Sequence, residues 1–147
     1  MRALSLSQPW AHVVVHGPKR VENRKANLRG PAQELVGVRI ALHAAKSWDP
    51  AGAGFIAGRG LVVEARETYV AGAVIGVATI ERVVGLAEQG SLPSGQSQWF
   101  FGPIGLLLAD VHAIAKPIPC RGFLGFWRLP EAIEVDLVAQ VREAAGG

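Results

Sequence analysis

The sequence predicts a single domain of mainly β (α+β) structure, in which about five or six strands form a small curved sheet or barrel with flanking helices. Two observations carry this prediction. The chain has 147 residues, half of them apolar, which suits one folded domain with a sizeable core. Its apolar stretches are mostly short, alternate with polar residues and are separated by glycine- and proline-rich turns, as strands are. We therefore expect residues 1–147 to form one domain.

The N-terminal region is predicted to form a strand and then a helix. Residues 2–6 have the alternating pattern of polar and apolar side chains that is typical of a short strand. Ser7 is a candidate N-cap, because its hydroxyl can accept a hydrogen bond from the first turn of a helix. Trp10, Val13 and Val14 follow at i, i+3 and i+4 and would form one apolar helical face.

A short second strand is expected after this helix. Gly17 and Pro18 are typical of a helix end, and residues 20–24 have the length of a strand. Side chains two positions apart share a face of a strand. Glu22 and Arg24 are therefore expected to point to the same side.

The rest of the chain is predicted from the same patterns. Further strands are expected over residues 38–44, 73–84, 104–114 and 122–129. The strand over residues 104–114 should bend near Asp110, and Pro117 and Pro119 should end its pattern, because proline cannot donate to a sheet ladder.

Two further helices and two irregular regions complete the prediction. Asp49 and Pro50 are a helix-start signal, but the glycines that follow predict a weak helix. Residues 131–145 form an amphipathic pattern with acidic residues at the start, as the helix dipole favours. Residues 30–37 are expected to be a loop, and residues 85–98 a polar region rich in turns.

The charge of the chain is small but uneven. The net charge is +3, and residues 1–66 hold ten lysines and arginines against four aspartates and glutamates. The N-terminal half is thus a candidate electropositive face for phosphate or another anion. Alternatively, cations and anions mix once the chain folds.

Cys120 is the one cysteine, so no disulfide framework is expected. With no pattern typical of a signal peptide or a bilayer span, we expect a cytoplasmic protein without membrane contact.

The charged residues after the first helix follow a defined spacing. "QPWA" opens that helix at residues 8–11, and Gly17, Lys19, Glu22 and Arg24 follow as Gly-x-Lys-x-x-Glu-x-Arg. This order resembles the opening signature of ASCH (activating signal cointegrator homology) domains. The resemblance continues in "IALHAAKSW", "GAVIGVATI", "FGPIGLLL" and "GFLGFWRL", up to about residue 130.

The resemblance implies a PUA-like fold, a small β-barrel with flanking helices. It also implies that a cleft beside the charged motif binds RNA or other nucleic acid. Some small members of the family are enzymes: certain bacterial ones hydrolyse the acetyl amide of N-acetylcytidine, and a ribonuclease activity is attributed to another member. Fold-level analogy of this kind raises a functional hypothesis without locating a site.

The residues themselves suggest how such a cleft would work. Arg24 can pair with Glu22 in a bidentate fashion, which would leave Lys19 free to meet a phosphate oxygen. The alternative is a surface ion pair with no function.

His43 and Lys46 stand at the end of the third predicted strand. His43 could contact a base or a phosphate, or act as a general acid or base; alternatively, it is a partly buried histidine bonded to backbone.

Two tryptophans are candidate stacking platforms for unpaired bases. They are Trp48 and Trp99, of which Trp99 lies beside the polar stretch "GQSQWFFGP". Stacking of a base on an aromatic ring is worth roughly 1–3 kcal/mol where it occurs. More often a tryptophan belongs to the core, and Trp10 and Trp127 are expected to do so.

An enzymatic function is the alternative to binding. The amidohydrolases of the family use a lysine and, three residues on, a threonine, but Glu22 stands at that place after Lys19. The hydroxyl nucleophile is therefore missing, and Glu81 could supply only a distant carboxylate. A ribonuclease would use His43 or Glu22 as the base. Lys19 and Arg24 would stabilise the developing charge.

No metal or other cofactor is expected. His12 and His16 have the i, i+4 spacing of helical zinc pairs, but they lie opposite the apolar face of the first helix and no third ligand follows at a motif spacing. The glycines of "GAGFIAGRG" lack the Lys-Ser/Thr ending of a phosphate-binding loop.

Overall fold

The computed structural model describes residues 1–146, which form a mixed sheet with the strand order β2-β5-β4-β3-β1-β6. The strands are β1 (Arg2–Gln8), β2 (Val21–Arg24), β3 (Arg39–Trp48), β4 (Ala73–Gly85), β5 (Ile104–Pro119) and β6 (Phe126–Arg128). The helices are α1 (Trp10–Val15), α2 (Arg29–Glu34), α3 (Pro50–Gly58) and α4 (Glu131–Gly146). Strands β1 and β3 are parallel, and the other neighbouring pairs are antiparallel. The α+β class with flanking helices is thereby confirmed.

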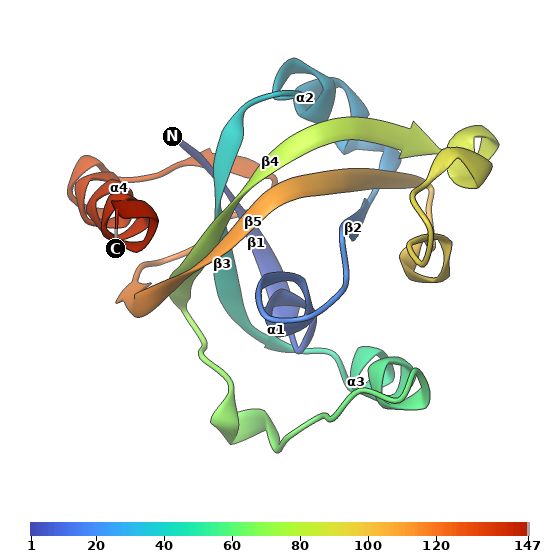
Figure 1. The fold of residues 1–147 in the computed structure, drawn as a ribbon, viewed down its shortest axis with the longest axis horizontal. Helices are drawn as coiled ribbons and strands as arrows, with labels where there is room; N and C mark the ends of the chain where they lie inside the picture. The colour runs from blue at the N-terminus through green and yellow to red at the C-terminus, as the bar shows by residue number, and fades with distance from the viewer. Residues whose placement is uncertain (147) are drawn as a thin grey trace.

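The sheet is strongly curved but does not close into a barrel, so that part of the prediction was wrong. Figure 1 shows β4 and β5 arching across the molecule, with α1 inside the curve and α4 at one end. The edge strand β6 pairs only with Arg2, Ala3 and Leu4 of β1. Residues 5–8 of β1 pair with β3 alone, so this half of β1 has an open edge. We call the gap between this edge and β2 the seam.

The short helix α1 is held in place by burial. A helix of this length has little stability of its own, but Ala11, Val13, Val14 and Val15 are all buried. A fully buried valine contributes about 1.5–3 kcal/mol. The expected cap at Ser7 was wrong, because Ser7 belongs to β1. The side chain of Gln8 replaces it: its amide oxygen accepts the hydrogen bond of the His12 N–H at 2.9 Å.

Several boundaries differ from the expected ones. Residues 30–37 are not a loop throughout, because Arg29–Glu34 is helical and buries Ala32. Strand β5 bends at Asp110 as predicted, where φ is +49°, but it continues through Pro117 to Pro119. Proline is tolerated there because this part of β5 pairs with β4 on one side only.

The remaining elements follow the predictions more closely. Strand β3 is longer than expected and β6 is shorter. Helices α3 and α4 begin where predicted, and the polar region after β4 contains two short 3₁₀ turns. Within residues 1–146, no helix has both the length and the apolar character needed to cross a bilayer.

Candidate functional site

A groove follows the seam and consists of three neighbouring pockets. The motif pocket, of about 340 Å³, lies over the charged motif and includes Ser5, Trp10, Lys19, Glu22, Arg24, Asp49 and Phe101. The side pocket, of about 500 Å³, includes Asn23, Arg24, Lys25, Asn27 and Leu124. The loop pocket, of about 730 Å³, includes Ser5, His43, Lys46 and residues 120–124. Shared residues join them: Ser5 lines the motif and loop pockets, Arg24 the motif and side pockets, and Leu124 the side and loop pockets.

Glu22 is the centre of a charge network on the floor of the motif pocket. Its Oε1 is 3.2 Å from Nζ of Lys19. Its Oε2 accepts a hydrogen bond from Nε of Arg24 at 3.1 Å and lies 2.9 Å from Nη2 of Arg24 in an ion pair. Nη2 of Arg24 also donates to the carbonyl oxygen of Ser5 at 2.7 Å. Glu22 and Arg24 do pair, but not in the expected bidentate form, because both nitrogens contact Oε2 while Oε1 faces Lys19. The same guanidinium spans the seam from β2 to β1.

Lys19 is not free, which corrects the expectation that it meets a phosphate. Its side chain is about 2% exposed, and Nζ donates to the carbonyl oxygen of Val21 as well as to Glu22. The ammonium also lies 5.2 Å from the ring centroid of Trp10. Burial lowers the pKa of Lys19, and the Glu22 carboxylate opposes this effect. The role that this geometry gives Lys19 is to position Glu22.

An aromatic wall completes the motif pocket. Trp10 is half-buried, so it is only partly the core residue that was expected. Its Nε1 donates to Oδ2 of Asp49 at 2.8 Å, and this hydrogen bond lowers the pKa of Asp49. The exposed Phe101 packs edge-on against it with the ring centroids 5.9 Å apart. A Cβ atom at Gly52 would come within 2.5 Å of Trp10 Nε1, so a glycine is needed beneath this wall.

His43 is a buried histidine bonded to backbone, which is the alternative that the sequence left open. It is 2% exposed. Nε2 lies 2.7 Å from the carbonyl oxygen of Cys120, which can only accept, so Nε2 carries the proton. Nδ1 then accepts from the hydroxyl of Ser5 at 3.0 Å, and Ser5 Oγ in turn accepts from Nε1 of Trp127 at 3.1 Å. Burial lowers the pKa of His43, which favours the neutral ring.

The other predicted contact residues are dispersed. Lys46 is exposed at the edge of the loop pocket. Trp48 lies outside the groove, in a separate hollow where its ring centroid is 5.7 Å from that of Tyr69. Trp99 is 1% exposed, so the expectation of a stacking platform there was wrong. A 3₁₀ turn directs its side chain into the core, against Phe55.

The two helical histidines face solvent, as expected. His12 and His16 are exposed, with ring centroids 4.9 Å apart. Within residues 1–146, no three His, Cys, Asp or Glu side chains gather in a group that could hold a metal ion.

Sequence reasoning missed the segment between β5 and β6. Residues 122–125 were expected to be part of the last strand, but β6 begins only at Phe126. Arg121, Phe123 and Leu124 of this segment line the loop pocket. The four residues 122–125 contain two glycines, and that density was the signal for a loop.

The geometry defines an α+β fold with a groove along the open seam of its sheet, and known structures share this fold. No protein-family model matches the chain, and no curated protein matches its sequence. ASCH from Zymomonas mobilis is 20% identical, with a TM-score of 0.53 over 94% of this chain and 93% of that chain. A variant of that protein with a serine replaced by alanine is 19% identical, with a TM-score of 0.53 over 94% of each chain. A variant with a tyrosine replaced by phenylalanine is 19% identical, with a TM-score of 0.51 over 94% of this chain and 96% of that chain.

The chain therefore shares its fold with the ASCH structure from Zymomonas mobilis. The expectation of an ASCH-like fold is confirmed, apart from the closed barrel.

Proposed function

We propose that the groove binds RNA or another single-stranded nucleic acid. The observation that carries this proposal is the charge of the groove. Arg24, Lys25, Lys46 and Arg121 lie along it. The carboxylates in the three pockets, Glu22 and Asp49, are already engaged, Glu22 by two cations and Asp49 by Trp10. The groove therefore favours a polyanion.

Arg24 is the residue best placed to contact a phosphate. Its side chain is 19% exposed, and Glu22 and the Ser5 carbonyl hold its Nε and Nη2. Within residues 1–146 Nη1 forms no hydrogen bond, so this nitrogen remains for a phosphate oxygen. A guanidinium fixed in this way loses little conformational entropy when it binds. The Lys19–Glu22 pair supports it from below. The motif is thus proposed to work through Arg24, with Lys19 and Glu22 as positioning residues.

The candidate catalytic groups are occupied, which favours binding over catalysis. Both ring nitrogens of His43 are hydrogen-bonded and the ring is buried. Both oxygens of Glu22 are in ion pairs. A general base must reach the proton that it removes, and neither group is free to do so. The amidohydrolase reaction lacks its threonine, and Glu81 is exposed on β4 and lines none of the three pockets.

Binding is tested with a fluorescently labelled single-stranded RNA titrated at several salt concentrations. Affinity for a single strand should fall with salt by a slope of about 0.7 on a log–log plot for each phosphate neutralised. Arg24→Gln and Lys46→Ala should each weaken binding and reduce this slope by about one such unit. Arg142→Ala is the matched control, because Arg142 is exposed on α4 and lines none of the groove pockets. An absence of binding to RNA and to single-stranded DNA at low salt would overturn the proposal.

A further inference from the structure

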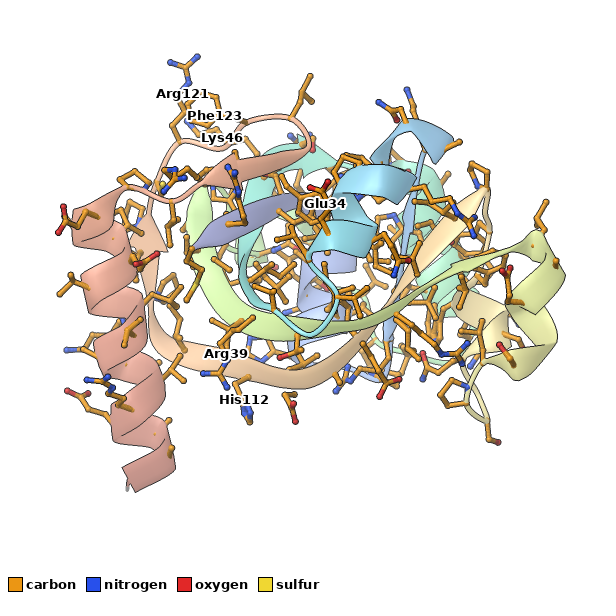
Figure 2. All side chains as sticks on the ribbon, turned by 90° about the horizontal axis from the view of Figure 1, so that it is seen from above. Glu34, Arg39, Lys46, His112, Arg121 and Phe123 are labelled. Atoms are coloured by element: carbon orange, nitrogen blue, oxygen red, sulfur yellow. The ribbon has the colours of Figure 1, made fainter. Side chains whose placement is uncertain are left out.

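The segment between β5 and β6 presents two apolar side chains to solvent beside the groove. Phe123 is 52% exposed and Leu124 is 99% exposed. Phe123 packs edge-on against Trp127 with centroids 5.6 Å apart, and the Arg121 guanidinium lies 5.2 Å from its ring centroid. Figure 2 shows Lys46, Arg121 and Phe123 on the same side of the molecule. Neighbouring exposed apolar side chains rimmed by polar groups are a candidate contact site.

The backbone of this segment is fixed on both sides. At its start, the Cys120 N–H donates to the Gly72 carbonyl at 3.0 Å, and the Cys120 carbonyl accepts from His43 at 2.7 Å. Gly122 lies so close to the pocket floor that a Cβ atom there would be 2.5 Å from His43 Cε1 and 2.6 Å from Ser5 Oγ. At its end, β6 joins the sheet through β1. Phe123 is therefore a preorganised platform, which lowers the entropic cost of binding.

The charges of the loop pocket complement a phosphate. Lys46 and Arg121 line it, and no carboxylate does so among the described residues. Neither cation forms an ion pair within residues 1–146. The pocket thus combines an aromatic ring with two available cations. Its volume of about 730 Å³ lies in the range of small-molecule sites.

We propose that the loop pocket holds one unpaired nucleobase, stacked on Phe123, while Lys46 and Arg121 bind the phosphate next to it. The inference rests on the proposed function and deepens it: the ligand is recognised partly through its bases, and not only as a polyanion. It also predicts that the ligand must be single-stranded, because a base in a duplex has both faces covered by its neighbours.

The test compares two ligands of equal charge, a single-stranded ten-nucleotide RNA and the same oligomer with every base removed. The protein should bind the RNA about 5- to 150-fold more tightly than the abasic oligomer, as a base–aromatic stack of roughly 1–3 kcal/mol provides. Phe123→Ala should reduce the ratio of the two affinities to about one and leave the affinity for the abasic oligomer unchanged. Phe123→Trp should retain the ratio. Val135→Ala is the control, because Val135 is exposed on α4 and outside the groove.

The cations give a second readout. Lys46→Gln and Arg121→Gln should weaken the binding of both oligomers to the same extent, because they contact the phosphate. A ratio close to one for the unmodified protein, or a ratio that Phe123→Ala leaves unchanged, would overturn the base site while the groove remains a polyanion site. If neither oligomer binds at low salt, the proposed function fails and the base site fails with it.

Discussion

Replacing Glu22 by glutamine would remove the anion from the floor of the groove while keeping the shape of the side chain. Lys19 would then be a buried ammonium without its carboxylate. The Nζ–Oε1 distance of 3.2 Å corresponds to an attraction of about 5 kcal/mol at an effective dielectric constant of about 20, before desolvation is subtracted. Removing one partner of a buried ion pair destabilises proteins by about 3–5 kcal/mol, and we expect a loss in that range at neutral pH.

The pH dependence of this loss provides a check. Burial already lowers the pKa of Lys19, and Glu22 opposes that effect. In Glu22→Gln the pKa of Lys19 should therefore fall further. A lysine with a lowered pKa in the folded state binds fewer protons than in the unfolded chain, so stability rises with pH. The difference between Glu22→Gln and the unmodified protein should shrink as alkaline pH removes the proton from Lys19.

The assay is urea unfolding followed by tryptophan fluorescence, at neutral and at alkaline pH. Lys19→Met combined with Glu22→Gln should be more stable than Glu22→Gln alone, because the uncompensated charge is gone. A loss below about 1 kcal/mol in the single variant would refute the reasoning, since it is the value of an exposed ion pair. It would mean that water reaches Lys19 in solution.

Two further perturbations test the loop pocket from the inside. His43 has a pKa lowered by burial, so as pH falls the unfolded chain takes up the proton first: stability should be full above the unfolded pKa of about 6.5 and decrease as pH falls from there toward the folded pKa. Burial and the charge of His16 lower the pKa of His12 as well. Urea unfolding at several pH values therefore compares His12→Gln with the double variant His12→Gln/His43→Gln. An equal loss of stability at low pH in both variants would contradict the assignment of this pH dependence to His43. Gly122→Ala should destabilise by about 1–3 kcal/mol through overpacking, because of the 2.5 Å approach to His43. Gly54→Ala is its control: a Cβ at Gly54 meets nothing within 4 Å, so thermal unfolding should show a gain of up to about 1 kcal/mol.

Local patterns were sufficient for part of the site. Glu22 and Arg24 could be paired from the sequence because strand residues two apart share a face, and the two side chains do meet. The bend at Asp110 could likewise be predicted from the interrupted apolar pattern. Both features depend on neighbours in the chain.

Features that depend on distant residues could not be found in this way. The burial of Lys19 requires the N–H of Lys19 to bond back to Val13 and its ammonium to lie against Trp10. The polar neighbours of Trp99 suggested exposure, yet its side chain packs on Phe55 of α3. The open seam depends on the short β6 pairing with only the first part of β1, which no local pattern indicates.

The seam has a consequence for solubility. Backbone groups at an unpaired sheet edge can pair with a second chain and lead to aggregation, and charged side chains placed on the edge prevent this. Arg24 occupies that position here, since its guanidinium donates to the Ser5 carbonyl on the open edge of β1. The residue proposed to hold a phosphate thus also keeps this edge from serving as a template for another strand.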